Sequence, residues 1–278
     1  MTGELAPPSA GAAVDVVPPR SEARRPSPRR SRSGRPRLLS IVDYTLRSCL
    51  PPRRWAAVLG ACAGALLFGL LARVVYRNVE SGFANVAAEG IFGLMVPIAA
   101  LVIGDAVLGA EVRAGTFHFT WRSPGPTSEI VLGRWIGGAL VAMLTIAPAC
   151  GLAAVVAGVP DRAWAAFVAG SAESLSYVAV FIAIACISRR TAVWSLAFVF
   201  LVERLLGTAL TGIAQLSPTW ESRAVFVGLL DFDVPNRLVR EGIPQGVGAI
   251  VRLTIVSAVA LGLATWRMRH LRLAGAVD

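Results

Sequence analysis

IGGALVAMLTIAPACGLAAVVAGV, residues 136–159, is an apolar run without a charged residue. A helix needs about 20 apolar residues to cross the hydrocarbon core of a bilayer, and this run is longer. Its one proline, Pro148, is tolerated in a membrane helix because neighbouring groups can satisfy the carbonyl that loses its partner. The run therefore predicts a membrane-spanning helix, and similar runs recur on both sides of it.

Five further apolar runs reach or approach the length of a span. They cover residues 55–72, 90–104, 164–187, 192–216 and 247–266. Over all 278 residues the chain is 55% hydrophobic and only 16% charged, against roughly 25% charged residues in a soluble domain. We therefore expect an all-α integral membrane protein of the cell membrane, with a bundle of six transmembrane helices over residues 55–278 in contact with the lipid bilayer.

Residues 1–37 differ sharply in composition from the rest of the chain. They are rich in proline, serine and arginine and show no apolar periodicity. Such a segment cannot bury enough apolar surface to offset its chain entropy, so we expect a disordered basic cytoplasmic tail. The main alternative is a tail that contacts anionic lipid headgroups, and we do not expect it to bind nucleic acid.

LLSIVDYTLRSCL, residues 38–50, has the pattern of a short amphipathic helix. Apolar side chains recur at helical spacing on one side, at Leu38, Val42, Leu46 and Cys49. Asp43 and Arg47, four residues apart, lie on the other side, where they can form an ion pair. The segment is too short to span, so we expect a helix in the cytoplasmic membrane interface, ended by Pro51 and Pro52. The alternative is a helix packed on the protein itself.

The arginines predict the orientation of the bundle. With the N-terminus inside, the cytoplasmic segments hold nineteen arginines and the outer segments hold six. Cytoplasmic loops carry an excess of positive residues, so we expect both termini in the cytoplasm. The outer segments are then residues 73–89, a short loop, and residues 217–246, a longer loop that we expect to cap the outer mouth of the bundle.

Residue types that are scarce exclude several kinds of chemistry. The chain has no lysine, so it cannot have a phosphate-binding G-x-x-x-x-G-K-S/T loop, a Schiff-base lysine or a Ser-Lys dyad. Its two histidines, His118 and His270, are far apart in the sequence, and its four cysteines show no CxxC spacing. We therefore expect no catalytic residues, no metal site and no cofactor bound by this chain, and we interpret the cysteines as small apolar residues.

The segment between the second and third spans, residues 105–135, is unusually charged and aromatic for a link between membrane helices. Its first part, DAVLGAEVRAG, continues the second span as a helix. Residues 116–122 then alternate between polar and apolar, as in an extended piece lying on an apolar surface. A Pro-Gly-Pro turn follows, and Thr127 or Ser128 is placed to cap the helix that leads into the third span.

This segment resembles the cytoplasmic loop of ABC-2 type permeases, the membrane subunits of one class of ATP-driven transporter. The family's elements come in a fixed order: an acid, a Gly-Thr pair, a turn rich in Pro or Ser, and an I-x-L-G-K/R start of the third span. Here they are Glu111, Gly115-Thr116, residues 123–126 and residues 130–134. The helix before the first span and the long outer loop before the sixth also match, so the resemblance covers residues 38–278.

The resemblance implies a function and its partners. In this family the loop docks into a cleft of a separate ATPase subunit, which binds ATP and Mg²⁺, and a second permease chain, identical or related, completes the substrate pathway. We therefore expect a transport subunit without enzymatic activity of its own, acting in export and as a dimer. The coupling residues that the resemblance implies are Glu111, Arg113, Gly115, Thr116, Phe117 and Arg122.

Several of these residues also have a purely structural interpretation. Glu111 could dock on the ATPase, or it could pair with Arg113 or Arg134 within the chain. The Gly-Thr pair could contact the partner while it shapes the turn. The aromatic residues that follow are more typical of membrane-interface anchors than of partner contacts.

Four charged residues lie inside the predicted spans: Glu173, Glu203, Arg204 and Arg252. An ionised side chain near the bilayer centre costs about 2.5–3.5 kcal/mol, so each should face the protein interior, a wet cavity or a partner. From their depths along the helices we expect Glu173 to pair with Arg252. If the two acids are instead proton sites, the chain would be an ion-driven carrier or a channel. An intramembrane hydrolase is a more distant alternative, because neither histidine lies in a span.

Overall fold

The computed structural model describes residues 37–49, 51–116, 126–188, 190–206, 216–230 and 245–270. All of them belong to one compact unit that extends from Pro36 to Asp278. Within these ranges every regular element is a helix, which confirms the all-α class. The predicted disordered tail, apart from Arg37, lies outside the described residues.

The described helices follow one another with short or undescribed links. Most are α-helical, while η1, η2 and η4 are π-helical and η3 is a 3₁₀ turn. Their bounds are α1 (Arg37–Cys49), α2 (Pro52–Val75), α3 (Val79–Val86), η1 (Ala87–Met95), α4 (Val96–Gly104), η2 (Asp105–Gly109), α5 (Ala110–Ala114), α7 (Thr127–Ala157), η3 (Pro160–Arg162), α8 (Ala163–Ile187), α9 (Thr191–Ala197), η4 (Phe198–Leu206), α12 (Pro218–Gly228) and α14 (Val247–Arg269).

Five continuous helical stretches are long and apolar enough to cross a membrane. They are Arg54–Val75, Val79–Ala114, Thr127–Ala157, Pro160–Ile187 and Val247–Arg269. Each corresponds to one of the predicted spans, so five of the six predicted spans are confirmed as helices of sufficient length and composition. Five helices of this length and composition indicate a membrane-embedded, multi-pass protein.

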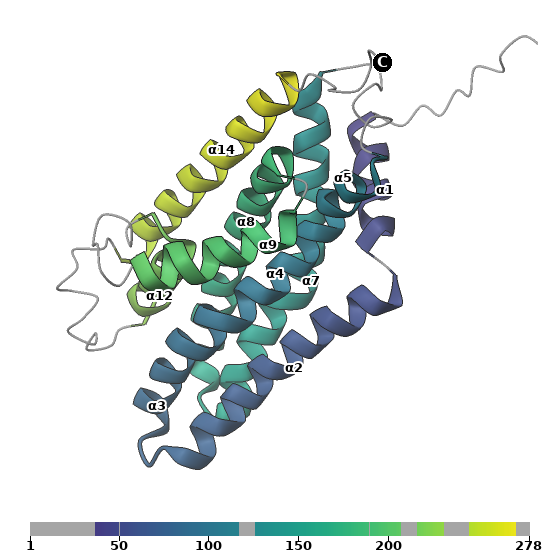
Figure 1. The fold of residues 1–278 in the computed structure, drawn as a ribbon. Helices are drawn as coiled ribbons and strands as arrows, with labels where there is room; N and C mark the ends of the chain where they lie inside the picture. The colour runs from purple at the N-terminus through teal and green to yellow at the C-terminus, as the bar shows by residue number, and fades with distance from the viewer. Residues whose placement is uncertain are drawn as a thin grey trace, which may run out of the picture. The chain divides into compact units, whose positions relative to one another are not determined.

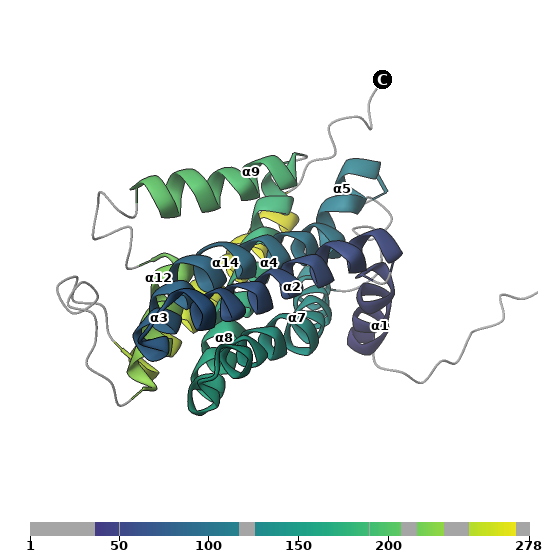
Figure 2. The ribbon, with the colours of Figure 1, turned by 90° about the horizontal axis from the view of Figure 1, so that it is seen from below.

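The sixth predicted span, residues 192–216, is described in part. α9 and η4 form a continuous helix from Thr191 to Leu206, and residues 207–215 lie outside the described part. The described helix is shorter than a span, so the count of six stays a prediction. Figure 2 shows α9 at the edge of the bundle, where it contacts α8 and η2.

The second span begins earlier than the sequence indicates. Residues 73–89 are predicted as an outer loop, but α2 continues to Val75 and α3 already begins at Val79. Asn78 caps the new helix, because its side chain accepts a hydrogen bond from the backbone amide of Ser81 at 3.3 Å. The prediction is wrong because the polar residues that suggested a loop lie on one face of a helix, whose apolar face is buried.

The bundle has two distinguishable ends (Figure 1). At one of them, which we call the loop end, α5 ends and α7 begins, and α1 and the C-terminal end of α14 lie beside them. The link between α2 and α3 lies at the opposite end, which we call the far end. The sequence predicts that the loop end faces the cytoplasm.

α7 and α8 form the centre of the bundle. α8 packs against α4, α7, α12 and α14, and α7 also packs against α1 and α2. Small side chains allow helices in a membrane to approach closely. Those buried along α8 include Ala165, Ala166, Ala169, Gly170 and Ala179.

α12 occupies part of the segment that is predicted as a long outer loop. Its residues from Pro218 to Val227 are all buried, and the helix packs against α8 and α14. A proline in the first turn suits a helix start, because its missing N–H would have had no partner within the helix. The predicted loop thus contains a buried helix, and residues 231–244 of the same segment lie outside the described part.

α1 is the predicted amphipathic helix, and its buried face packs on α7. Val42, Thr45 and Cys49 are buried, whereas Asp43 and Arg47 form an ion pair at 2.9 Å near the surface. The alternative prediction, that this helix packs on the protein itself, is therefore confirmed for the face that carries Val42, Thr45 and Cys49. A position of α1 in the membrane interface stays a prediction.

Two glycines on α7 make room for α1. A Cβ atom added at Gly137 would lie 2.7 Å from the Cβ of Thr45, and one added at Gly133 would lie 2.8 Å from the Ile41 Cγ2 atom. Real carbon atoms do not approach so closely, so either substitution must displace α1.

We expect Gly137→Ala to destabilise the protein by about 1–3 kcal/mol, because the added methyl group overpacks the contact between α1 and α7. Gly262→Ala on α14 is the matched control, since no atom lies within 4 Å of the position of its added Cβ. The measurement is thermal unfolding of both variants in mild detergent. Equal unfolding temperatures would show that α1 does not pack on α7 through this glycine.

Candidate functional site

Polar side chains gather at two places in the bundle. One lies at the loop end and is centred on Arg134; we call it the Arg134 clamp. The other lies where α8, η4 and α12 converge and contains Glu173, Tyr177, Glu203 and Thr219; we call it the carboxyl cluster. The first bears on the predicted coupling loop, and the second on the predicted charges inside the spans.

The Arg134 clamp joins α7 to the helices on either side of it. The guanidinium is 2% exposed, and its Nη2 donates to both carboxylate oxygens of Glu111, at 2.6 and 2.8 Å. Its Nη1 donates to the backbone oxygen of Val107 at 2.9 Å. The guanidinium also lies 4.7 Å from the centre of the Tyr44 ring on α1. One side chain of α7 therefore binds η2, α5 and α1 together.

The environment of the clamp acts on the phenol of Tyr44. Burial, followed by the nearby Glu111 carboxylate, raises the pKa of Tyr44, so the phenol stays neutral beside the guanidinium. A charge-assisted hydrogen bond between guanidinium and carboxylate is about twice as strong as one between neutral groups, and here Nη2 contacts both carboxylate oxygens while Nη1 contacts the Val107 carbonyl. The clamp is thus a geometric constraint on the end of α5.

Glu111 is therefore paired with Arg134, one of the two intrachain partners considered from the sequence. Arg113, the other, forms a bidentate pair with Asp105 instead. A docking contact of Glu111 with another protein stays a prediction. Its carboxylate is already engaged in the clamp, so its role in this structure is to position the turn that follows.

The turn after α5 has the form that the Gly-Thr pair predicts. Gly115 has φ +68°, a left-handed conformation that favours glycine. Its amide donates to Val112 at 3.3 Å, and the amide of Thr116 donates to the Glu111 carbonyl at 3.1 Å. This Schellman arrangement satisfies the last carbonyls of the helix. Thr116 is exposed, while Phe117 and Arg122 lie outside the described residues.

The start of α7 differs from the prediction. Neither Thr127 nor Ser128 caps the helix, because the residue at the cap position is Pro126 and no side-chain cap bond forms. Thr127 instead accepts a hydrogen bond from Arg269 of α14 at 3.3 Å. Glu129 is in the first turn, as predicted, where the helix dipole favours an acid.

In the carboxyl cluster, the carboxyl group of Glu203 is contacted by two hydroxyl groups. One of its oxygens, Oε2, accepts a hydrogen bond from the hydroxyl of Tyr177 and another, at 3.0 Å, from the hydroxyl of Thr219. The Tyr177 and Thr219 oxygens are themselves 2.6 Å apart. All three side chains are buried, so this is a polar contact inside an apolar bundle.

Glu173 lies one turn before Tyr177 on the same face of α8. It is 0% exposed, and neither carboxyl oxygen has a hydrogen-bond partner among the described residues. The hydroxyl-bearing side chains of Ser222 and Thr219 on α12 face its carboxyl group, and the Ser222 hydroxyl also donates to the backbone oxygen of Thr219 at 2.9 Å. Glu173 is thus an acid enclosed by the bundle.

The predicted pair of Glu173 and Arg252 is wrong. Arg252 lies 3.5 Å from the carboxylate of Glu221, on α12. The prediction compared depths along two spans and treated the segment between them as an outer loop. α12 packs against both α8 and α14. Its Glu221 therefore lies close enough to Arg252 to form the ion pair that was predicted for Glu173. The side chain of Arg204 lies outside the described residues.

The sequence argument missed two of the four members of the carboxyl cluster, Tyr177 and Thr219. Tyr177 could have been found, because it follows Glu173 by one helical turn and so shares its face. Thr219 and Glu221 gave no signal, since they were assigned to the outer loop expected to cap the mouth of the bundle. The π-helical form of η4, which carries Glu203, cannot be read from the sequence; such segments are frequent at functional sites.

The far end holds two further ion pairs that tie helices together. Arg162, after α7, lies 3.0 Å from the Glu80 carboxylate on α3. Arg223 on α12 lies 3.1 Å from the Glu89 carboxylate on η1. Both guanidinium groups are nearly buried and both acids are largely exposed, so these pairs lie at the boundary between the bundle and its surroundings.

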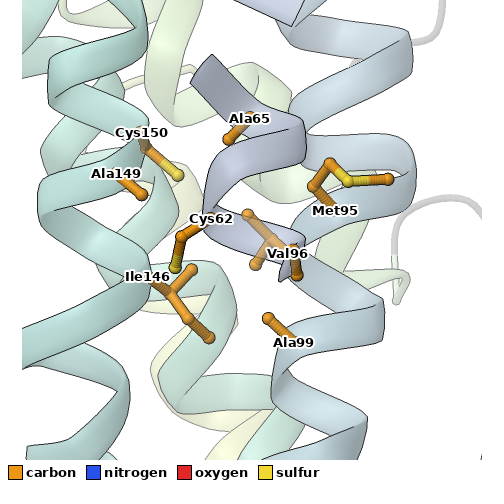
Figure 3. A pocket seen from close by; sticks show the side chains of 9 residues that line it. Cys62, Ala65, Met95, Val96, Ala99, Ile146, Ala149 and Cys150 are labelled. Carbon is orange, nitrogen blue, oxygen red and sulfur yellow. The ribbon is translucent and has the colours of Figure 1, made fainter. Parts of the chain in front are cut away.

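A small hollow between α2, α4 and α7 is apolar (Figure 3). Cys62 and Cys150 both line it, and Met95 lies at its edge. Its nine lining residues include no charged side chain, so it is a packing gap without groups to orient a ligand. All four cysteines are free thiols, and burial raises the pKa of the Cys49 thiol, which agrees with their interpretation as small apolar residues.

Within the described residues, no group of three or more His, Cys, Asp and Glu side chains is arranged to hold a metal ion. No protein-family model and no curated protein matches this sequence. The function is therefore inferred from the arrangement of the residues themselves.

We expect Arg134→Met to destabilise the protein by on the order of 3 kcal/mol, because Glu111 then loses the guanidinium that compensates its buried charge. Adding Glu111→Gln should recover most of that loss, since it removes the charge. The control is Arg47→Met, whose pair with Asp43 is largely exposed and should contribute about 0–1 kcal/mol. Free energies of unfolding in detergent are measured for these three variants and for Glu111→Gln alone, and additive effects of the two clamp substitutions would contradict the clamp.

Glu221 should make stability depend on pH. This residue of α12, outside the five spans, is buried, and burial raises its pKa from 4.5 to about 7 although Arg252 opposes the shift. Between these values the unfolded chain loses its proton while the folded chain keeps it, so raising the pH across this window lowers the free energy of unfolding. Glu221→Gln should flatten that part of the profile. Unfolding temperatures as a function of pH measure it, and an unchanged slope in the variant would refute the assignment.

Proposed function

We propose that this chain is the permease subunit of an ATP-driven transporter of the ABC-2 type, that it works in export, and that a separate ATPase subunit drives it. The proposal rests on the order of the loop elements in the sequence and on one structural observation. This observation is a short turn at the loop end whose base is fixed to three helices by the Arg134 clamp.

A turn of this kind suits the transfer of force. Thr116 is exposed at its start, where another protein can reach it. Glu111, at its base, is held by Arg134 on α7, and α7 runs for 31 residues to the far end. A displacement of the turn therefore moves a rigid helix instead of bending a flexible loop.

Other features agree with a chain that depends on partners. The sequence has no lysine and hence no phosphate-binding loop of the Walker type, so ATP and Mg²⁺ would bind on the ATPase. α2 and α14 carry many exposed apolar side chains, which lipid or a second permease chain, identical or related, would cover. We propose that two such chains enclose the substrate pathway.

The orientation follows from the arginines. The loop end holds the start of α1, the turn after α5 and the last turn of α14, which carries Arg267 and Arg269. An excess of positive residues marks the cytoplasmic side. We therefore place the loop end and both termini in the cytoplasm, and the protein in the cell membrane.

An ion-coupled carrier is the second candidate, and the carboxyl cluster favours it. Glu173 and Glu203 are buried acids inside a membrane domain, where ionisable groups often belong to ion or proton pathways. In such a carrier, transport by the purified chain in vesicles would follow an ion gradient and would need no nucleotide.

Substitution of Thr116 by arginine tests the proposed coupling. The added charge would lie in the contact with the ATPase, where an uncompensated charge costs about 1.4 kcal/mol or more and weakens binding about tenfold or more. We expect co-purification of the ATPase and its stimulated ATP hydrolysis to fall accordingly. Unfolding of the permease itself should not change, because Thr116 lies outside the clamp contacts.

Arg77→Glu, an equally exposed change at the far end, is the control and should leave ATPase binding intact. Equal effects of the two variants would show that the turn is not the docking site. Transport by the chain alone, driven by an ion gradient, would replace the proposal with the carrier.

A further inference from the structure

An arginine and an apolar hollow lie side by side where α2 begins. Arg54 is the first residue of the apolar stretch Arg54–Val75, at the end of α2 opposite the far end. Its side chain is partly exposed and lines the hollow. The other lining side chains are apolar and come from α1, α2, α4, η2 and α7; they include Trp55, Val58, Val102 and Val141. A cation therefore lies against an otherwise apolar space at the end of a span.

The last turn of α1 holds the Arg54 guanidinium in place. Its Nη1 donates to the backbone oxygen of Ser48 at 2.6 Å, and the last carbonyls of a helix have no partner within it. Among the described residues, this oxygen is the one that accepts a hydrogen bond from the guanidinium. A guanidinium carries several N–H donors in one plane, so the others remain available to a ligand.

The acids near this site are engaged by other arginines. Each acid that the structure describes on α1, η2, α5 and the first turn of α7 is paired with an arginine other than Arg54. The pairs are Asp43 with Arg47, Asp105 with Arg113, Glu111 with Arg134 and Glu129 with Arg37. α2 has no acid in its first turn either, where the helix dipole favours an anion. The charge of Arg54 is therefore left to be complemented by a ligand.

We propose that this site binds an anionic phospholipid, with its phosphate on the Arg54 guanidinium and part of an acyl chain in the hollow. Guanidinium groups form strong charge-assisted hydrogen bonds with phosphate oxygens, and basic pockets between membrane helices bind acidic headgroups. The hollow has about 230 Å³ of empty space, including its open side, and it is narrow enough to suit a chain of methylene groups. Trp55 beside it is of the type that lies at headgroup level.

Other ligands of the same charge or shape fit the site less well. A soluble phosphate would leave the apolar lining in contact with water, whereas an acyl chain covers it. A zwitterionic phospholipid would bring a second cation close to the guanidinium, and like charges in contact weaken binding. The site requires only a surrounding bilayer, so it does not rest on the proposed transport function.

Native mass spectrometry of the full chain, released from detergent micelles, counts the phospholipids that stay bound. The chain is titrated with phosphatidylglycerol and, separately, with phosphatidylcholine. We expect a phosphatidylglycerol molecule to be retained under conditions that remove phosphatidylcholine. Glycerol phosphate, which carries the anionic group without acyl chains, should not displace it at an equal concentration.

Substitutions at Arg54 test the contact with the phosphate. Arg54→Gln should weaken the binding of phosphatidylglycerol about tenfold or more, because hydrogen bonds between charged groups are lost. Arg54→Lys keeps the charge but not the planar set of donors, so its affinity should lie between those of the native chain and Arg54→Gln. The matched control is Arg47→Gln, at an exposed arginine of α1 that is paired with Asp43, and it should leave the affinity unchanged.

Val102→Trp tests the hollow independently of the charge. Val102 is half-buried and lines the hollow, so a larger ring there should occupy the space of the acyl chain and lower the affinity for phosphatidylglycerol. Unfolding temperatures show which variants are folded. Val102→Trp decides the case if Arg54→Gln, which loses the bond to Ser48, fails to fold.

The proposal is overturned if the native chain retains both phospholipids equally. Equal losses of affinity in Arg47→Gln and Arg54→Gln would show a general attraction of anions to the surface instead of a site. Displacement by glycerol phosphate would identify a site for soluble anions, and native affinity in Val102→Trp would show that no acyl chain enters the hollow.

Discussion

The guanidinium of Arg134 is enclosed where three helices meet, and it can remain charged there because Glu111 and the Val107 carbonyl both contact it. A buried charge that loses its partner is much more costly than a buried pair. α5 and α7 therefore cannot separate at the loop end without leaving a charge uncompensated. α1 is joined to them by the contact between the guanidinium and the Tyr44 ring, so the described ends of these three helices are held together at one side chain.

The same requirement is met differently elsewhere in the bundle. At the far end, Arg162 and Arg223 reach acids that are themselves exposed, so water shares the stabilisation of each pair. Between the two ends, Glu203 accepts hydrogen bonds from the hydroxyl groups of Tyr177 and Thr219. Hydroxyl groups thus contact a buried acid inside the bundle, as buried polar groups require, while guanidinium groups reach exposed acids at the far end.

The helices that cross the membrane could be predicted because an apolar run of span length has few alternatives. Errors arose where polar residues belong to helices: Glu80 and Glu89 suggested a loop, yet they lie on the outer face of α3 and η1. For Glu111 the partner that the structure shows, Arg134, is one of the alternatives that the sequence left open. The partner of Arg252 was missed, because its acid lies on α12, a helix whose packing depends on contacts distant in the sequence.

The short links at the far end restrict how the bundle can part. Only residues 76–78 join α2 to α3, and α7 passes to α8 through a few residues around η3. Helices joined so tightly move as pairs. Any parting of the bundle at this end therefore has to separate one helix pair from the other, α2 and α3 from α7 and α8, instead of displacing a single helix.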